Sequence, residues 1–310
     1  MFRFVQKYKK PLKEMRIHIK ILIFFLFINS TTYAQDNYEF FGAIKLNGND
    51  KTLITYRIVF QEKSGIIQGY SITDLDGSHE TKNTITGTYD KKKKLLTFQE
   101  KDILYTKSKF AQSSFCFVNF SGKVKLVDNN SKIEGNFKGL YKNKTKCIDG
   151  VINLVGSTKI YNLASRVNKK IQKSKNIDAE IKIKSNPFAI LDSLKINKLY
   201  KDQNLNVFWE SKKIKIEIFD SGKEDGDVIS LFHNGNFILE NYKVKNEKKV
   251  LSIQLDPSIS NEFKILAINE GTILPNTAKI ILIDEKRTFE LLTSFKKNES
   301  AFITLIKKEL

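Results

Sequence analysis

Histidine, cysteine, tryptophan and arginine are scarce in this chain of 310 residues, which holds three His, two Cys and one Trp. If residues 1–34 are removed as proposed below, only His79 and His233 remain. Two histidines exclude a three-histidine zinc centre, and a Ser-His-Asp triad would have to use one of them. A G-x-S-x-G nucleophile motif, a phosphate-binding glycine loop and HExxH are also missing. We therefore expect no catalytic residues and no enzyme.

Long apolar runs are absent as well. The longest one near the N-terminus, Ile21–Ile28, is shorter than the ~20 residues that a membrane-spanning helix needs. It follows a basic start at Met15 and precedes small and polar residues that end at Ala34, which is the layout of a secretory signal peptide. We expect residues 1–34 to be removed and the rest to be exported to the periplasm, the cell surface or the medium. The true start is either Met1 or Met15, and a membrane anchor is the alternative interpretation.

The expected export decides the interpretation of the two cysteines, Cys116 and Cys147. An even, small number of cysteines in an oxidising compartment favours a disulfide, and two cysteines allow one internal pairing. A reactive thiol or a metal ligand is the alternative, but no CxxC spacing supports it. We predict a Cys116–Cys147 disulfide that joins two strand ends at one rim of the N-terminal domain.

Positive charge is abundant but comes almost entirely from lysine. The formal net charge is +19, and it falls to +13 without residues 1–34, which hold seven Lys or Arg and one acid. Only Arg57, Arg166 and Arg287 lie beyond residue 34. Base and phosphate recognition relies on arginine forks. We therefore expect no nucleic-acid partner and interpret runs such as "DKKKK" as solvated turns.

A short pattern recurs between residues 38 and 155: a glycine followed by alternating apolar residues, as in "FFGAIKL", "IIQGYSI" and "IDGVINL". Alternation with period two indicates half-buried strands, and a glycine inside a strand permits a sharp bend. The strands expected are 38–46, 52–61, 66–74, 82–90, 95–105, 115–126, 132–140 and 147–155. Eight strands joined by short turns predict an antiparallel, lipocalin-like barrel over residues 36–156, with an open meander as the alternative.

Bulky side chains at the expected inward positions favour a filled barrel over one with a ligand cavity. These side chains are Phe40, Tyr56, Phe60, Tyr70, Tyr89, Phe98, Phe117 and Phe137.

Residues 157–206 interrupt the strand pattern and predict a polar connector, with a short amphipathic helix over 161–175. The pattern returns over 207–310. Strands are expected at 207–219, 228–233, 237–244, 250–256, 262–269, 278–284, 288–294 and 300–307. This spacing predicts an Ig-like β-sandwich whose core is anchored by Trp209, and an exposed tryptophan that stacks on carbohydrate is the alternative. The fold class is thus all-β, with two domains that fold separately.

Two acidic turns are candidate metal sites. The turn "DSGKEDGD" supplies Asp220, Asp225 and Asp227, and Ca²⁺ prefers several such oxygen ligands. The spacing is not that of an EF-hand, and Lys223 adds opposing charge, so an ordinary exposed hairpin is the preferred interpretation. In "DLDGSHE", residues 74–80, two aspartates and His79 could bind a metal, but a solvated hairpin is again preferred.

The C-terminal turns carry a resemblance. "DSGKEDGDVISLFHNG" followed by "LAINEGTILPNTAKIILID" resembles a β-sandwich module at the C-termini of exported bacterial proteins, notably from Bacteroidota, with the pattern DxGxxDGD…NxGTxxPNTA. The match covers roughly residues 212–307, and "GYSITDLDGSHETKNTITGTYD" resembles a domain of exported flavobacterial proteins. The resemblance implies fold and export but no reaction. It also implies that the two turns lie together, in which case Glu270 and Asn276 could join the aspartates around Ca²⁺, the only cofactor suggested.

Three functions stay open at this point. An exported, non-catalytic binding or surface-interaction protein is the first choice, with a cell-surface component or a polysaccharide as its partner. A carrier of a small apolar ligand in the barrel is the second. A glycoside hydrolase that uses two carboxylates is the third, although nothing in the sequence selects a pair of acids.

Overall fold

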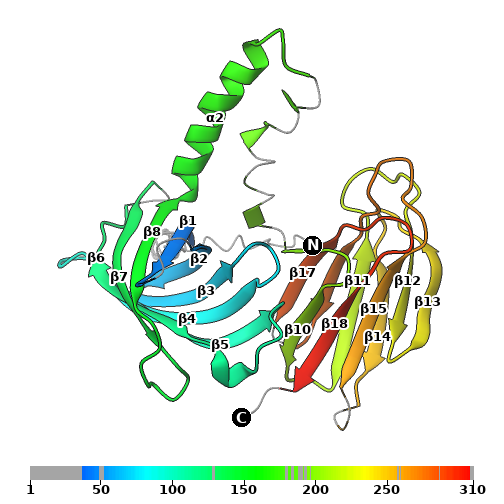
Figure 1. Cartoon of the computed structure of the whole chain (residues 1–310), viewed down its shortest axis with the longest axis horizontal. Coiled ribbons are helices and arrows are strands. Elements are labelled where there is room, and N and C mark those ends of the chain that lie inside the picture. Colours follow the sequence, from blue (N-terminus) through cyan, green and yellow to red (C-terminus); the bar gives the residue numbers. More distant parts are fainter. Residues whose placement is uncertain are drawn as a thin grey trace, which may run out of the picture. The chain divides into compact units, whose positions relative to one another are not determined.

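The structure is a computed structural model (Figure 1). It describes residues 37–48, 52–127, 130–178, 181–182, 185–187, 191, 194–195, 197–256, 258, 260–285 and 287–307. The proposed signal peptide, residues 1–34, lies outside the described residues.

The N-terminal region is a closed antiparallel barrel of eight strands, drawn from blue to green in Figure 1. Each strand pairs with the next one in sequence, and β8 pairs with β1 to close the ring. The prediction of an eight-stranded barrel is confirmed, and the open meander is wrong. The strands are β1 (Asn37–Leu46), β2 (Leu53–Lys63), β3 (Ile66–Asp74), β4 (Thr81–Asp90), β5 (Leu95–Thr106), β6 (Phe117–Lys123), β7 (Lys132–Leu140) and β8 (Gly150–Gly156).

Most of the bulky residues expected inside the barrel do form its core. Six of the eight belong to one buried cluster: Phe40, Tyr56, Phe60, Tyr89, Phe98 and Phe137. Phe117 instead packs in a separate cluster with Ile103 and Phe208. Tyr70 is only half-buried and lies against the charged ends of Arg57 and Lys82, because its neighbours Ile67 and Ser71 take the buried positions of β3. For these two side chains the expected facing was wrong.

The stretch expected to be a connector begins with a helix and ends in strands. Helix α2 (Ser157–Lys173) is 17 residues long and has no buried residue, which agrees with the predicted amphipathic, surface helix. Within the described residues, no helix is long and apolar enough to cross a membrane. Strand β9 (Asn197–Leu199) and the start of β10 (Asn204–Trp209) lie before residue 207, the expected boundary. Ordered structure of the second region therefore starts earlier in the chain than the sequence pattern suggested.

The C-terminal region is a β-sandwich. One sheet has the order β13-β12-β15-β18-β10 and the other β14-β11-β16-β17-β9, and side chains from both form one core. The remaining strands are β11 (Lys213–Phe219), β12 (Val228–His233), β13 (Asn236–Lys243), β14 (Lys249–Gln254), β15 (Asn261–Ala267), β16 (Lys279–Ile283), β17 (Thr288–Thr293) and β18 (Ser300–Lys307). Strands β9–β18 number ten, which is more than the seven or nine of an Ig fold.

Trp209 belongs to this core, as predicted. Its side chain is 4% exposed, its ring lies 6.0 Å from that of Phe289, and its indole N–H donates to the Lys213 carbonyl. A tryptophan buried to this degree has no free face for carbohydrate, so the stacking alternative is wrong.

The barrel and the sandwich are also joined through backbone pairing. The end of β5 pairs with β10 at Thr106–Asn206 and Tyr105–Val207, and Tyr105 contributes its ring to the sandwich core. That residues 36–156 and 207–310 fold independently stays a prediction.

Candidate functional site

A cavity of about 420 Å³ opens at one end of the barrel, among the turns that join β1 to β2, β3 to β4, β5 to β6 and β7 to β8. This volume lies within the range of small-molecule sites. Most of its wall is apolar and includes Ile44, Leu46, Ile54, Phe115, Val118, Phe137 and Ile148. The large aromatic side chains fill the barrel elsewhere, so the interior is filled only in part.

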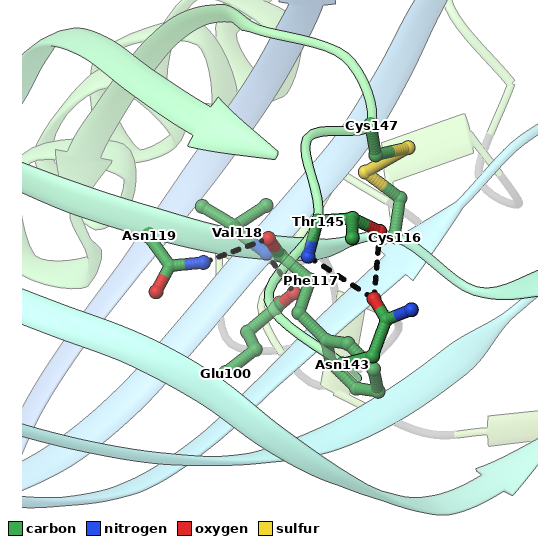
Figure 2. The surroundings of a disulfide bond; sticks show 8 residues. All are labelled: Glu100, Cys116, Phe117, Val118, Asn119, Asn143, Thr145 and Cys147. Carbon is green, nitrogen blue, oxygen red and sulfur yellow. Dashed lines mark hydrogen bonds between the residues drawn. A yellow bond between two sulfur atoms is a disulfide. The ribbon is translucent and has the colours of Figure 1, made fainter. Parts of the chain in front are cut away.

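A buried carboxyl group, Glu100, lies at the floor of this cavity and is 5% exposed. Its Oε1 accepts hydrogen bonds from the Tyr56 hydroxyl (3.0 Å) and from the Ser71 hydroxyl. Its Oε2 accepts one from Val118 N–H at 2.7 Å, which is drawn in Figure 2. The side chain of Asn83 also bonds to it. Burial raises the pKa of Glu100 above its usual range, although these hydrogen bonds oppose the rise.

Among the residues that the structure describes, three polar atoms in the wall of the cavity lack a hydrogen-bond partner. They are Asn83 Oδ1, Ser108 Oγ and Asp74 Oδ1, and each is shielded from solvent without a hydrogen bond. Asn83 and Ser108 are only 5% and 4% exposed. Buried polar atoms are nearly always paired in folded proteins, and a buried unpaired one costs about 1 to 3 kcal/mol. Two of the three atoms can only accept, which favours a ligand that donates hydrogen bonds.

A disulfide, shown in Figure 2, joins the cavity wall at Cys116 to Cys147. Cys116 and Cys147 are joined, with their Cα atoms 6.0 Å apart, so the disulfide predicted from the sequence is confirmed. Cys116 and its neighbours Phe115 and Phe117 all line the cavity. The bond therefore ties this wall to the segment that leads into β8.

The raised pKa of Glu100 gives a pH dependence. The folded state binds the proton of Glu100 more tightly than the unfolded state does, for which the ordinary value is 4.5. The associated stabilisation is complete below pH 4.5 and is lost as pH rises through the folded-state pKa. The variant Glu100→Gln has no carboxyl group to ionise, so it does not lose this stabilisation as pH rises. The free energy of unfolding of the variant, relative to the wild type, should therefore increase as pH rises above 4.5.

Urea unfolding of both proteins between pH 4 and pH 9, followed by circular dichroism, measures this difference. Glu134→Gln is the matched control, because Glu134 is an exposed acid on β7. Its difference from the wild type should not change with pH in the same direction. A Glu100→Gln difference that stays flat over this range would contradict the assignment.

Glu100 was missed in the sequence, although a signal was present. In β5 the inward positions alternate as Leu96, Phe98 and Glu100, so a carboxylate stands where the pattern calls for a core residue. An acid at a core position of a strand is a candidate functional group. Asn83 and Ser108 come from other segments and follow no spacing that the sequence could show.

The "DLDGSHE" turn lies at the mouth of the cavity, and its side chains go to separate partners. Glu80 accepts from the Tyr105 hydroxyl at 2.6 Å and pairs with Lys107 at 3.5 Å. Asp76 accepts from Ser78, and His79 stacks on Phe110. This distribution favours the hairpin interpretation of the turn.

The acidic turn of the sandwich, between β11 and β12, lies against the link between β15 and β16, as the resemblance implied. Thr272 N–H donates to the Asp225 carbonyl, and Ile273 N–H donates to Asp225 Oδ2 at 3.0 Å. Thr277 N–H donates to Asp227 Oδ2 at 2.7 Å. Asn276 is fully buried and uses its amide nitrogen to bond the carbonyls of Val228 and Asn269.

The side chains of this turn are more buried than an exposed hairpin requires. Asp227 is 1% and Asp220 is 6% exposed, and Asp225 is half-buried. Burial, with the charges of Asp225 and Asp220 nearby, raises the pKa of Asp227 to about 6, although the bond from Thr277 opposes the rise. Glu270, in the link between β15 and β16, is half-buried.

The second histidine, His233, is structural. Its ring stacks on Phe263 with the centroids 4.6 Å apart, and Nε2 lies 3.0 Å from Asn261 Oδ1. Neither contact brings it to a nucleophile.

Comparisons with protein-family models, with curated proteins and with solved structures found no match to this chain.

Proposed function

We propose that this protein is an exported, non-catalytic binding protein whose barrel takes a small, mainly apolar ligand that carries a hydroxyl or amino group. The observation that supports this most is the cavity of about 420 Å³, which is lined both by apolar side chains and by buried acceptor atoms that have no partner within the described residues. The disulfide and the signal-like residues 1–34 support export. The sandwich would serve as the surface-interaction part.

The polar groups of the cavity favour a ligand that donates hydrogen bonds over one that carries a carboxylate. Asp74 and Glu100 both line the cavity, so a carboxylate ligand such as a fatty acid would meet acidic side chains. A donor group would instead pair Asn83 Oδ1 and Asp74 Oδ1, which have no partner within the described residues. Hydrogen bonds of this kind are worth about 0.5 to 1.5 kcal/mol each, and the apolar wall supplies the rest of the affinity.

The glycoside hydrolase alternative is less well supported. Such an enzyme needs a carboxylic acid that is free to protonate the leaving group. Both oxygens of Glu100 already accept hydrogen bonds, from Tyr56, Ser71 and Val118 N–H. These contacts suit a group that organises the cavity floor better than a general acid.

The test uses 2-naphthol, a small aromatic alcohol, and 2-naphthoate, which has the same rings and a carboxylate. Calorimetric titration of the full mature chain at pH 7 should show saturable binding of the alcohol, at least about tenfold tighter than of the acid. A tenfold difference corresponds to about 1.4 kcal/mol. Absence of saturable binding of either compound, or tighter binding of the acid, would overturn the proposed ligand class.

A matched pair of variants on β2 locates the binding. Ile54→Trp puts a large side chain into the cavity, whereas Leu53, its neighbour, is 65% exposed and does not line it. Ile54→Trp should weaken 2-naphthol binding at least about tenfold, and Leu53→Trp should leave it unchanged. Circular dichroism checks that both variants are folded. Equal affinities in the two variants would place the binding elsewhere.

A further inference from the structure

The loop end of the sandwich gathers negative charge that has no positive partner. Asp220 and Asp227 are nearly buried, and within the described residues none of Asp220, Asp225 and Asp227 forms a salt bridge. Lys223, in the same turn, is exposed and forms none either. Burying a carboxylate is costly unless a cation or several hydrogen-bond donors compensate it. A hairpin needs no such arrangement.

Two oxygen atoms at this place are buried and have no hydrogen-bond partner within the part of the chain that the structure describes. They are Asp227 Oδ1 and Asn276 Oδ1, from residues that are 1% and 0% exposed. The Asn276 amide nitrogen is held by the carbonyls of Val228 and Asn269, so its orientation is fixed. Thr277, the next residue, bonds the other oxygen of Asp227. Two oxygen atoms that are held in place but receive no hydrogen bond indicate a ligand that accepts their electron pairs, such as a metal cation.

The packing at Gly271 brings the carboxylates together. A Cβ atom added at Gly271 would lie 2.8 Å from both Asp225 Oδ1 and Asp227 Oδ1, so oxygens of two carboxylates converge on one point. Two like charges so close repel one another unless a cation lies between them. Gly271 has a φ of +58°, so a side chain there would be strained as well as obstructed.

The chemical types of the candidate ligand atoms indicate which metal ion would bind here. Within the described residues, no three His, Cys, Asp or Glu side chains form a compact metal cluster. The oxygens here come instead from two carboxylates and one amide, in loops whose backbone carbonyls lie close by. Calcium accepts this mixture of oxygen ligands in flexible loops, whereas zinc prefers nitrogen and sulfur ligands and magnesium requires a strict octahedron.

We propose that the loop end of the sandwich binds one Ca²⁺ through Asp225, Asp227 and Asn276, with Asp220 adding negative charge beside them. The ion would hold the β11–β12 turn against the β15–β16 link. Glu270, included among the candidate ligands from the sequence, is half-buried in the same link and stays a predicted ligand. The proposal is independent of the ligand cavity in the barrel.

The experiment is a thermal melt and a calorimetric titration of the full mature chain after treatment with a chelator. At 5 mM Ca²⁺ the melting temperature of the sandwich should rise by about 5 °C or more, since an ion that binds only the folded state stabilises it. Fluorescence of Trp209, which lies in the sandwich core, reports this transition. An equal concentration of Mg²⁺ should produce a smaller rise.

Asp227→Asn is the decisive variant, because it keeps an oxygen for the Thr277 bond and removes one charge. Without Ca²⁺ it should melt higher than the wild type, since repulsion is relieved, and it should gain nothing from Ca²⁺. Asp225→Asn, at a half-buried position, gives a second reading if the first variant does not fold. Glu224→Gln is the control, because Glu224 is an exposed acid in the same turn and should keep the full Ca²⁺ effect.

No heat of binding and no shift in the wild type would overturn the proposal and leave a hairpin without a ligand. Equal Ca²⁺ shifts in the wild type and in both aspartate variants would also overturn it, because the ion would then act elsewhere.

Discussion

Replacing Gly69→Ala is expected to lower the free energy of unfolding by about 3 kcal/mol, the upper part of the range for overpacking. A Cβ atom at this position of β3 would lie 2.0 Å from the Val59 carbonyl oxygen and 2.6 Å from Phe60 Cα. These are backbone atoms of the neighbouring strand, so no side-chain rotation can relieve the contact. Strands β2 and β3 would have to separate locally, and the hydrogen bonds between them would weaken.

Urea unfolding of the full chain, followed by circular dichroism, measures this loss. Gln68→Ala is the matched control, because Gln68 is exposed on the same strand and its replacement should change stability by no more than about 0.5 kcal/mol. Similar losses in the two variants would show that the close approach at Gly69 does not constrain the barrel.

The same contact recurs around the barrel, which explains why the glycine pattern could be read from the sequence. A Cβ atom at Gly42 or Gly87 would also lie 2.0 Å from a carbonyl oxygen of an adjacent strand, and one at Gly139 would lie 2.0 Å from the carbonyl oxygen of Ile148, just before β8. Strand glycines commonly mark places where another backbone approaches closely or a sheet bends. Together with period-two alternation they predict the strands of a closed barrel within a few residues at most ends.

The strand prediction was least accurate where the chain passes from one sheet of the sandwich to the other. Residues 207–219 read as one strand, but the structure divides them into β10 and β11, which belong to different sheets. The core residues are odd-numbered in β10, up to Trp209, and even-numbered in β11, from Ile214, so the alternation changes phase across the polar residues 210–213, and this sign of the break was overlooked. Strand β9 was missed for another reason: it has three residues and pairs with β17, which is distant in sequence.

The two candidate sites differ in how far the sequence could predict them. The aspartates of the sandwich lie in one turn, and a resemblance indicated the second turn that packs on it. The cavity is built from side chains such as Asn83, Glu100 and Ser108, which lie on β4, on β5 and just after β5, and no local sequence motif marks them. Bulky residues in the same strands favoured a filled interior, and they do fill it except at this end.

Removing the disulfide should have the second large effect. Replacing Cys116→Ser together with Cys147→Ser is expected to lower the free energy of unfolding by about 3 to 4 kcal/mol. The bond closes a loop over a sequence separation of 31 residues, and a cross-link of this span restricts the unfolded chain by about that amount. Urea unfolding of the wild type and the double variant, each with and without reductant, measures the effect.

Reductant should destabilise the wild type to the level of the double variant and leave the variant unchanged, which makes the variant its own control. The same proteins test the wall of the cavity. Phe115, Cys116 and Phe117 line the cavity, so removing the cross-link should weaken 2-naphthol binding by the double variant. Binding is measured without urea, after circular dichroism has shown that the variant is folded. A double variant as stable as the wild type would contradict the role assigned to the disulfide. A double variant that is less stable but binds 2-naphthol as the wild type does would mean that the cross-link supports the barrel but not its cavity.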